Sequence, residues 1–392
     1  MPASAFLDPS VQHAVADVYE RLSRLPISAV LAHRRQLRGD TNKLAPLIAV
    51  PEDATIGEIM LLLRNEGILA LPVYRVMDEG AGVGRQYTGI ISIYDILAYT
   101  VFQKVFDPSG DQDPGKLRNL VDSMMEEQDQ YFGTPVRELI GKSYESKESW
   151  SLHSSTPLSS LLQLFTTGSF HRALILDDEA LRAETDGSDG PGPTAPPEGS
   201  FTTMVTQSDL LHFLADFDDM PRESLSRIVN LPCRDLDALA TQRSRKASTS
   251  VDTAQKPRVV TVPDSVTALQ AFREMYVNRV SAVAVIDKEG GLAANLSASD
   301  LRGLSSSNLG CLFDNVYTFL EIDTRRRSDQ IKADQLKFVS PETPLVTATD
   351  MMRDSRIHRV WIADDGDHPV GVVTLSDVLS VFVPDVSVAS EQ

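Results

Sequence analysis

The sequence predicts an α/β protein made of four tandem repeats, each with the order strand, helix, strand, strand, helix. Four segments share one ending: an apolar strand-like run, a Ser or Thr, two variable residues, an Asp and an apolar helical stretch. Upstream of each ending lie a proline-marked start, an amphipathic helical pattern and a short run of Val, Ile and Leu. A unit of roughly 60–80 residues is marginally stable alone. We therefore expect two pairs of repeats that bury their sheets against one another.

Residues 1–25 precede the repeats and contain an amphipathic stretch from Val11 to Leu25. Its apolar side chains recur at helical spacing, which predicts a helix with one buried face. We expect this helix to cap the first repeat, and a helix that binds a partner protein is the alternative.

The first repeat is assigned to residues 26–105, with its first helix and second strand between Pro51 and Tyr74. A glycine-rich segment, residues 80–84, then separates its two long strands. This segment lacks the strand-to-helix context of a dinucleotide-binding loop, so we expect a flexible hairpin.

The other three repeats follow the same order, and their extra length falls in connecting segments. Loops tolerate insertions at low entropic cost, whereas core strands do not. The second repeat is assigned to residues 130–218 with a Gly/Pro-rich insertion at 183–200, the third to residues 225–305 with a polar loop at 240–256, and the fourth to residues 312–384.

Composition excludes several classes of protein. Of 392 residues, 42% are hydrophobic, which is enough apolar surface to fold, and we find no apolar run long enough to span a membrane. The formal net charge of −18 disfavours a nucleic-acid partner, because binding a phosphate backbone needs a broad basic field. The N-terminus lacks the pattern of a secretory signal, and Cys233 and Cys311 are isolated thiols typical of a reducing compartment. We expect a cytoplasmic location, with the nucleus as an additional one.

The repeated Ser/Thr-x-x-Asp ending has two interpretations. At a strand-to-helix junction, Ser or Thr is a good N-cap and Asp in the first turn complements the helix dipole. The same Asp could instead accept hydrogen bonds from the two hydroxyls of a ribose, while the Ser/Thr hydroxyl and helix amides hold a phosphate or sugar oxygen. The candidate residues are Ser92 with Asp95, Thr206 with Asp209, Ser297 with Asp300, and Thr374 with Asp377.

Two His-Arg pairs form the second candidate group. His171-Arg172 and His358-Arg359 stand at the same place in the second and fourth repeats, at the start of the strand after the first helix. The arginine fork suits phosphate oxygens, and a neighbouring histidine adds a donor. A pair of surface charges at a strand edge is the alternative, which the matching positions make less favourable.

These residues carry a family resemblance. Ile357 to Val360, Asn278 to Ala282 and Val373 to Leu379 resemble segments of proteins with four cystathionine-β-synthase (CBS) repeats, and of the γ regulatory subunit of AMP-activated/SNF1-type protein kinase in particular. The resemblance covers about residues 26–384. It implies two CBS pairs in a pseudo-symmetric disc, with AMP, ADP or ATP in central clefts.

The resemblance also implies roles for individual residues. Asp95, Asp300 and Asp377 match ribose-binding positions, and the two His-Arg pairs together with Ser281 match phosphate-binding positions. Leu69 stands where the family has a phosphate-binding arginine, which weakens one phosphate contact. Asp209 is present where the family usually lacks an aspartate, which could create an extra site.

We therefore expect a regulatory subunit that senses adenine nucleotides and modulates a protein kinase complex, with kinase catalytic and scaffold subunits as partners. The alternative is an interaction scaffold that regulates a kinase or phosphatase without nucleotide control, as in the fungal four-CBS cell-separation proteins that it also resembles. No catalytic or metal-binding motif stands out, so we expect neither an enzyme nor a metal site.

Overall fold

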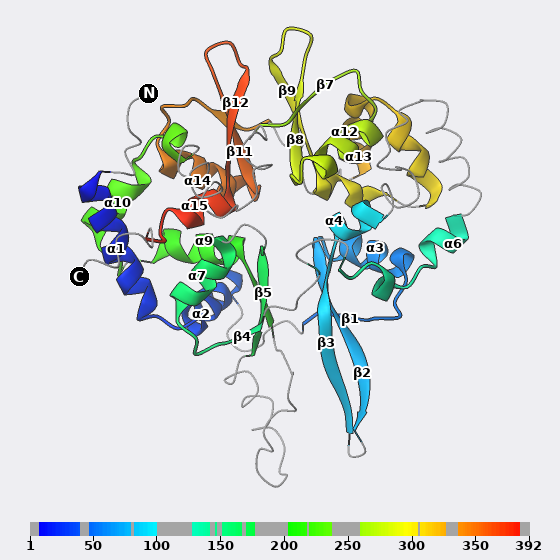
Figure 1. The fold of residues 1–392 in the computed structure, drawn as a ribbon, viewed down its shortest axis with the longest axis horizontal. Helices are drawn as coiled ribbons and strands as arrows, with labels where there is room; N and C mark the ends of the chain where they lie inside the picture. The colour runs from blue at the N-terminus through cyan, green and yellow to red at the C-terminus, as the bar shows by residue number, and fades with distance from the viewer. Residues whose placement is uncertain are drawn as a thin grey trace, which may run out of the picture. The chain divides into compact units, whose positions relative to one another are not determined.

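The computed structural model of the protein divides into two compact units (Figure 1). Unit 1 comprises Met1–Leu47, Trp150–Arg258 and Lys337–Gln392, and unit 2 comprises Ile48–Ser149 and Val259–Leu336. The structure describes residues 8–39, 47–79, 82–99, 128–141, 146, 151–166, 170–176, 203–217, 219–236, 259–304, 306–326 and 336–384. The predicted insertion at 183–200 and the polar loop at 240–256 lie outside these residues.

Each repeat contributes one three-stranded sheet, in which the first strand pairs parallel to the second and the second antiparallel to the third. In unit 2 the strands are β1 (Val50–Pro51), β2 (Ala70–Glu79), β3 (Gly82–Ser92), β7 (Thr261–Pro263), β8 (Ala282–Ile286) and β9 (Leu292–Ser297). In unit 1 they are β4 (Ser151–His153), β5 (Arg172–Leu176), β6 (Thr203–Thr206), β10 (Phe338–Val339), β11 (Arg359–Ala363) and β12 (Pro369–Thr374).

A helix follows the first strand of each repeat, and a second helix follows the third strand. The first set is α3 (Ile56–Asn65), α7 (Leu158–Thr166), α12 (Ala268–Val277) and α14 (Leu345–Ser355). The second set is α4 (Ile93–Leu97), α9 (Gln207–Asp216), the 3-10 helix η6 (Ala298–Gly303) and α15 (Leu375–Ser380). The predicted α/β class and the order of elements within the repeats are confirmed. The predicted hairpin is also present, since Glu79 of β2 lies opposite Gly82 of β3.

The pairing of repeats does not follow the order of the chain. Unit 1 holds the second and fourth repeats around one apolar core, and unit 2 holds the first and third around another. Within unit 1 the two repeats meet where α15 packs on α7 and α9, and within unit 2 where α4 packs on η6. We expected paired repeats to bury their sheets mutually. Strand residues of both repeats do lie in each shared core, such as Ala173 and Val360 in unit 1 and Val73 and Val283 in unit 2, and the helices of the two repeats also pack on one another.

The segment that leads into each repeat packs on a different repeat. Ile27, ahead of the first repeat, donates its backbone N–H to Thr156 of the second (2.9 Å), and Val136 in turn donates to Ala54 of the first (2.8 Å). The same exchange joins Cys233 to Thr343 (2.9 Å) and Val316 to Val266 (3.0 Å). The lead segments contain α2 (Ser28–Arg38), α6 (Gln128–Phe132) with η3 (Val136–Glu138), α10 (Arg222–Val229), and η7 (Ser306–Phe313) with α13 (Val316–Arg326). With the boundaries assigned at 26, 130, 225 and 312, each repeat therefore includes a lead segment that packs on a different repeat.

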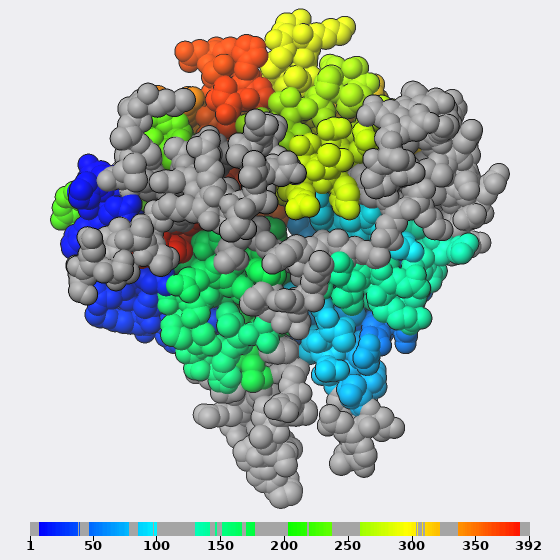
Figure 2. Space-filling view, viewed as in Figure 1, coloured from blue at the N-terminus to red at the C-terminus, as the bar shows by residue number. Residues whose placement is uncertain are grey.

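The N-terminal helix α1 (Pro9–Ser23) belongs to unit 1, not to the first repeat. It packs on α10 and α7, and its apolar side chains, including Val18 and Leu22, are fully buried there. The space-filling view shows the blue N-terminal residues directly against green residues of the second repeat (Figure 2). The prediction that this helix caps the first repeat was wrong, and its buried face is not open to a partner protein.

Candidate functional site

All four Ser/Thr-x-x-Asp endings form reciprocal capping boxes at the start of a helix. In each box the aspartate Oδ2 accepts hydrogen bonds from both the backbone N–H and the hydroxyl of the Ser or Thr three residues earlier. The N–H distances are 2.9 Å for Ser92 to Asp95, 2.9 Å for Thr206 to Asp209, 2.7 Å for Ser297 to Asp300 and 2.8 Å for Thr374 to Asp377. The structural interpretation of the motif therefore holds in every repeat.

The four carboxylates differ in burial. Asp95 has no exposed surface and Asp300 is 9% exposed, whereas Asp209 and Asp377 are only partly buried. In this conformation a ligand cannot reach Asp95, so the residues around it would have to move first. The repeats are thus unequal as candidate ribose sites.

The predicted phosphate positions lie beside these capped helix ends. The first residue of the second strand pairs with the capping Ser or Thr, as in Arg172 opposite Thr206 and Arg359 opposite Thr374. The residue before it accepts a hydrogen bond at its carbonyl from the first N–H of the helix. These carbonyls belong to Leu69 (2.9 Å), His171 (3.0 Å), Ser281 (3.0 Å) and His358 (3.2 Å). Anions bind well at such helix N-termini because backbone N–H groups and the helix dipole favour negative charge.

Because of how the repeats pair, the predicted phosphate-binding positions with basic residues lie in one unit and the equivalent uncharged positions lie in the other. Unit 1 receives both His-Arg pairs, His171-Arg172 and His358-Arg359. Unit 2 has Leu69-Ala70 and Ser281-Ala282 at the equivalent places, so none of its four residues there is a cation. Ser281, a predicted phosphate contact, therefore lies in a different unit from the basic residues. The sequence alone did not show which repeats pair, so it could not show this segregation.

The two capped helix ends of unit 1 touch each other. Gln207, the first residue of α9, donates from Nε2 to the Ser376 hydroxyl of α15 at 2.8 Å and to the Phe165 carbonyl at 3.1 Å. The Gln207 side chain is buried, and its backbone N–H bonds the carbonyl of His171. The structure thus joins the first turns of α9 and α15, the helices that carry Asp209 and Asp377, within unit 1.

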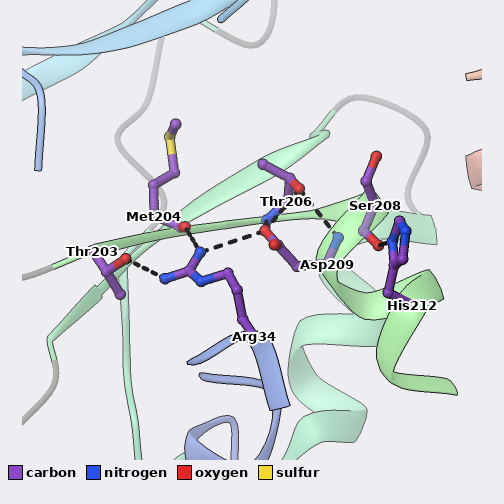
Figure 3. A network of polar contacts seen from close by, with 7 residues as sticks. All are labelled: Arg34, Thr203, Met204, Thr206, Ser208, Asp209 and His212. Carbon is purple, nitrogen blue, oxygen red and sulfur yellow. Dashed lines mark hydrogen bonds and ion pairs between the residues drawn. The ribbon is translucent and has the colours of Figure 1, made fainter. Parts of the chain in front are cut away.

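Sequence reasoning missed Arg34, which lies on α2 and reaches the second repeat (Figure 3). Its guanidinium donates to the Met204 carbonyl (2.8 Å) and the Thr203 hydroxyl (2.6 Å), and its Nη1 lies 3.6 Å from Asp209 Oδ2. The available signal was a third His-Arg pair in the sequence, His33-Arg34. It stands in a lead segment, where the repeat pattern gave no reason to expect a contact with Asp209.

Unit 2 has an aromatic pair near its capped helix ends. Tyr94 of α4 stacks on Tyr276 of α12 with ring centroids 6.5 Å apart. Burial raises the pKa of the Tyr94 hydroxyl to about 12, with smaller contributions from Tyr276 and Asp95. This tyrosine is therefore neutral at physiological pH and presents an uncharged ring and hydroxyl.

Other chemistry has little support in the described residues. They include no group of three or more His, Cys, Asp or Glu side chains that could hold a metal ion. Burial raises the pKa of the Cys233 thiol to about 11, so it is not a thiolate nucleophile at neutral pH. Where the structure is described, no helix combines the length and the apolar character needed to cross a membrane.

Comparison with known families identifies the repeats. A model of the CBS domain matches residues 42–101, 251–307 and 329–384, which fall on the first, third and fourth repeats. The chain therefore contains CBS domains at these residues. The second repeat escapes the family model, yet it has the same three-stranded sheet and the same capping box as the other CBS repeats.

Relatives that match over most of their length show which CBS-containing proteins the chain resembles. The chain is 24% identical over 352 residues to the "SNF1-related protein kinase regulatory subunit gamma-like PV42a" of Arabidopsis thaliana, a match that spans 85% of this chain and 90% of that one. It is 22% identical to the plant's PV42b protein of the same description, over 93% and 96% of the two chains. The crystal structure of protein MJ1225 from Methanocaldococcus jannaschii has the same fold, with a TM-score of 0.54, 16% identity and coverage of 87% and 98%. The predicted resemblance to γ-type subunits is confirmed.

Proposed function

We propose that this CBS protein is a regulatory subunit that binds adenine nucleotides and modulates a protein kinase complex. One observation carries the proposal. In unit 1, His171-Arg172 and His358-Arg359 stand beside two capped helix N-termini that Gln207 and Ser376 link directly. Two arginine forks, two imidazoles and two helix ends in one unit suit a phosphorylated ligand, in a chain that is otherwise strongly acidic.

The proposed regulation is thermodynamic linkage. AMP, ADP and ATP share the adenosine group but differ in phosphate charge, so they would contact the basic residues differently. A ligand shifts a conformational equilibrium only by its difference in affinity for the two states. The kinase catalytic and scaffold subunits would read that shift, and the chain itself would catalyse no reaction. A cytoplasmic or nuclear location remains a prediction of the sequence.

Calorimetry on the full chain tests the proposal with AMP, ADP and ATP as separate ligands. Arg172→Ala and Arg359→Ala should each weaken binding by about tenfold or more, since each removes a charge-assisted contact to phosphate. Arg353→Ala is the matched control, because this arginine of α14 pairs with Asp350 and Asp354 and belongs to neither His-Arg pair. Equal binding by all three variants, or no binding by the unmodified chain, would contradict the proposal.

A scaffold without nucleotide control is the second candidate. Two observations favour it: the aspartate forms a helix capping box in all four repeats, and the equivalent positions of unit 2 carry no cation. This function predicts that SNF1-type kinase subunits bind the chain equally well with and without millimolar AMP or ATP. It also predicts that Arg172→Ala leaves that binding unchanged. A nucleotide-dependent change in affinity would exclude it.

A further inference from the structure

We infer that Arg34 fills the place beside the Asp209 carboxylate of the second repeat, so that Asp209 holds α2 in position and does not bind a nucleotide. The inference rests on the proposed function only for the adenine nucleotide as ligand, since the contact between Arg34 and Asp209 lies within unit 1 whether or not a ligand binds. It separates Asp209 from Asp377, which the sequence pattern treats as equivalent.

The geometry fixes Arg34 from three sides (Figure 3). The side chain is 13% exposed, and of the three contacts drawn there two are to β6, at the Met204 carbonyl and the Thr203 hydroxyl. The third is the 3.6 Å approach of Nη1 to Asp209 Oδ2. These partners are about 170 positions away in the sequence, so the contact belongs to the fold and is not local.

Arg34 is not required to complete the helix cap. Asp209 Oδ2 already accepts from the Thr206 backbone N–H at 2.9 Å and from the Thr206 hydroxyl at 2.8 Å. The guanidinium adds an ion pair to the same oxygen, at 3.6 Å, and offsets the charge of the carboxylate. It therefore places a positive charge beside the acidic side chain that a ribose would have to approach.

Displacement by a ribose would be unfavourable. A neutral hydroxyl would replace a cation beside Asp209, and it would leave a largely buried guanidinium without its carboxylate. Removing one partner of a largely buried ion pair is costly because the other charge stays desolvated. Since Thr203 and Met204 hold Arg34 firmly on the strand, the cation cannot simply turn away to solvent.

The first experiment compares matched substitutions by calorimetry with AMP on the full chain. Asp209→Asn and Asp377→Asn change the same position of two capping boxes, and asparagine keeps an acceptor for the cap. We expect Asp209→Asn to leave the dissociation constant for AMP within about twofold, and Asp377→Asn to weaken it by about tenfold or more. If Asp209→Asn weakens AMP as much as Asp377→Asn does, the inference is overturned while the proposed function stands.

The second experiment needs no ligand and so survives failure of the proposed function. Thermal unfolding is measured for Arg34→Met, Asp209→Asn and the double variant. We expect each single change to lower the melting temperature by about 2–4 °C and the double variant to lower it by less than the sum of the two single shifts. Additive shifts would show that the two side chains do not interact, and would overturn the inference whether or not the chain binds AMP.

Discussion

Gln207 and Ser376 link the second and fourth repeats through a 2.8 Å hydrogen bond between the first turns of two helices. Gln207 is buried between α7, α9 and α15, and its amide also holds the last turn of α7 at the Phe165 carbonyl. A buried polar side chain with satisfied bonds favours one arrangement of its neighbours over others. In unit 1 this bond fixes how the first turns of α9 and α15 meet.

Replacing Gln207 by Leu should therefore destabilise unit 1. The buried Phe165 carbonyl and the partly buried Ser376 hydroxyl would each lose a donor, and the loss at the buried carbonyl costs about 1–3 kcal/mol. Urea unfolding followed by circular dichroism measures the change. Gln163→Leu is the control, because Gln163 lies on the exposed side of α7 and bonds Tyr19 there. If both substitutions cost the same, the Gln207 bond has no special importance for stability.

A substitution at Thr374 tests the helix-capping role of the motif separately from any contact with a ligand. Thr374→Ala removes the side-chain acceptor that the Asp377 backbone N–H uses at 3.2 Å, and also the hydroxyl that donates to its carboxylate. We expect a loss of about 1 kcal/mol in stability, which Thr374→Ser should restore because serine caps as well as threonine. The measurement is urea unfolding without nucleotide. Unchanged stability in the alanine variant would mean that the motif has no capping role in solution.

Local patterns in the sequence predicted the repeats and their elements well. Helical spacing and strand-like runs are short-range properties, and the fourfold Ser/Thr-x-x-Asp ending marks each strand-to-helix junction directly. The capping interpretation follows from the same local geometry, so Asp95 and its three equivalents lie where the pattern placed them.

Contacts between repeats could not be predicted in this way. All four repeats have similar apolar faces, so nothing local indicates that the second pairs with the fourth or that lead segments exchange partners. The same limit explains the error on α1, whose amphipathic pattern predicts a buried face without saying what covers it. Arg34 was missed for this reason too, since its contact with Asp209 exists only after α2 packs on the second repeat.

The packing of α1 can be tested with two leucines. Leu22 on α1 is fully buried in the core of unit 1, whereas Leu37 on α2 is 57% exposed. Leu22→Ala should lower the free energy of unfolding by about 2–5 kcal/mol, because it leaves a cavity in addition to the lost burial, and Leu37→Ala should change it by less than about 0.5 kcal/mol. Urea unfolding distinguishes them. A Leu22→Ala variant as stable as Leu37→Ala would mean that α1 does not pack on unit 1 in solution.

The two cysteines should differ in reactivity and in their effect on alkaline stability. Burial raises the pKa of Cys233 from 9.0 to about 11, whereas Cys311 is partly exposed. Alkylation by iodoacetamide at pH 8 should modify Cys311 well before Cys233, and the Cys311→Ala variant should label only slowly.

Because the unfolded thiol ionises near pH 9 and the folded thiol only near 11, the contribution of Cys233 to stability is constant below pH 9 and is lost as the pH rises towards 11. Cys233→Ala should remove that alkaline slope. Rapid labelling of the Cys311→Ala variant, or a slope that persists in Cys233→Ala, would show that the thiol is not buried as described.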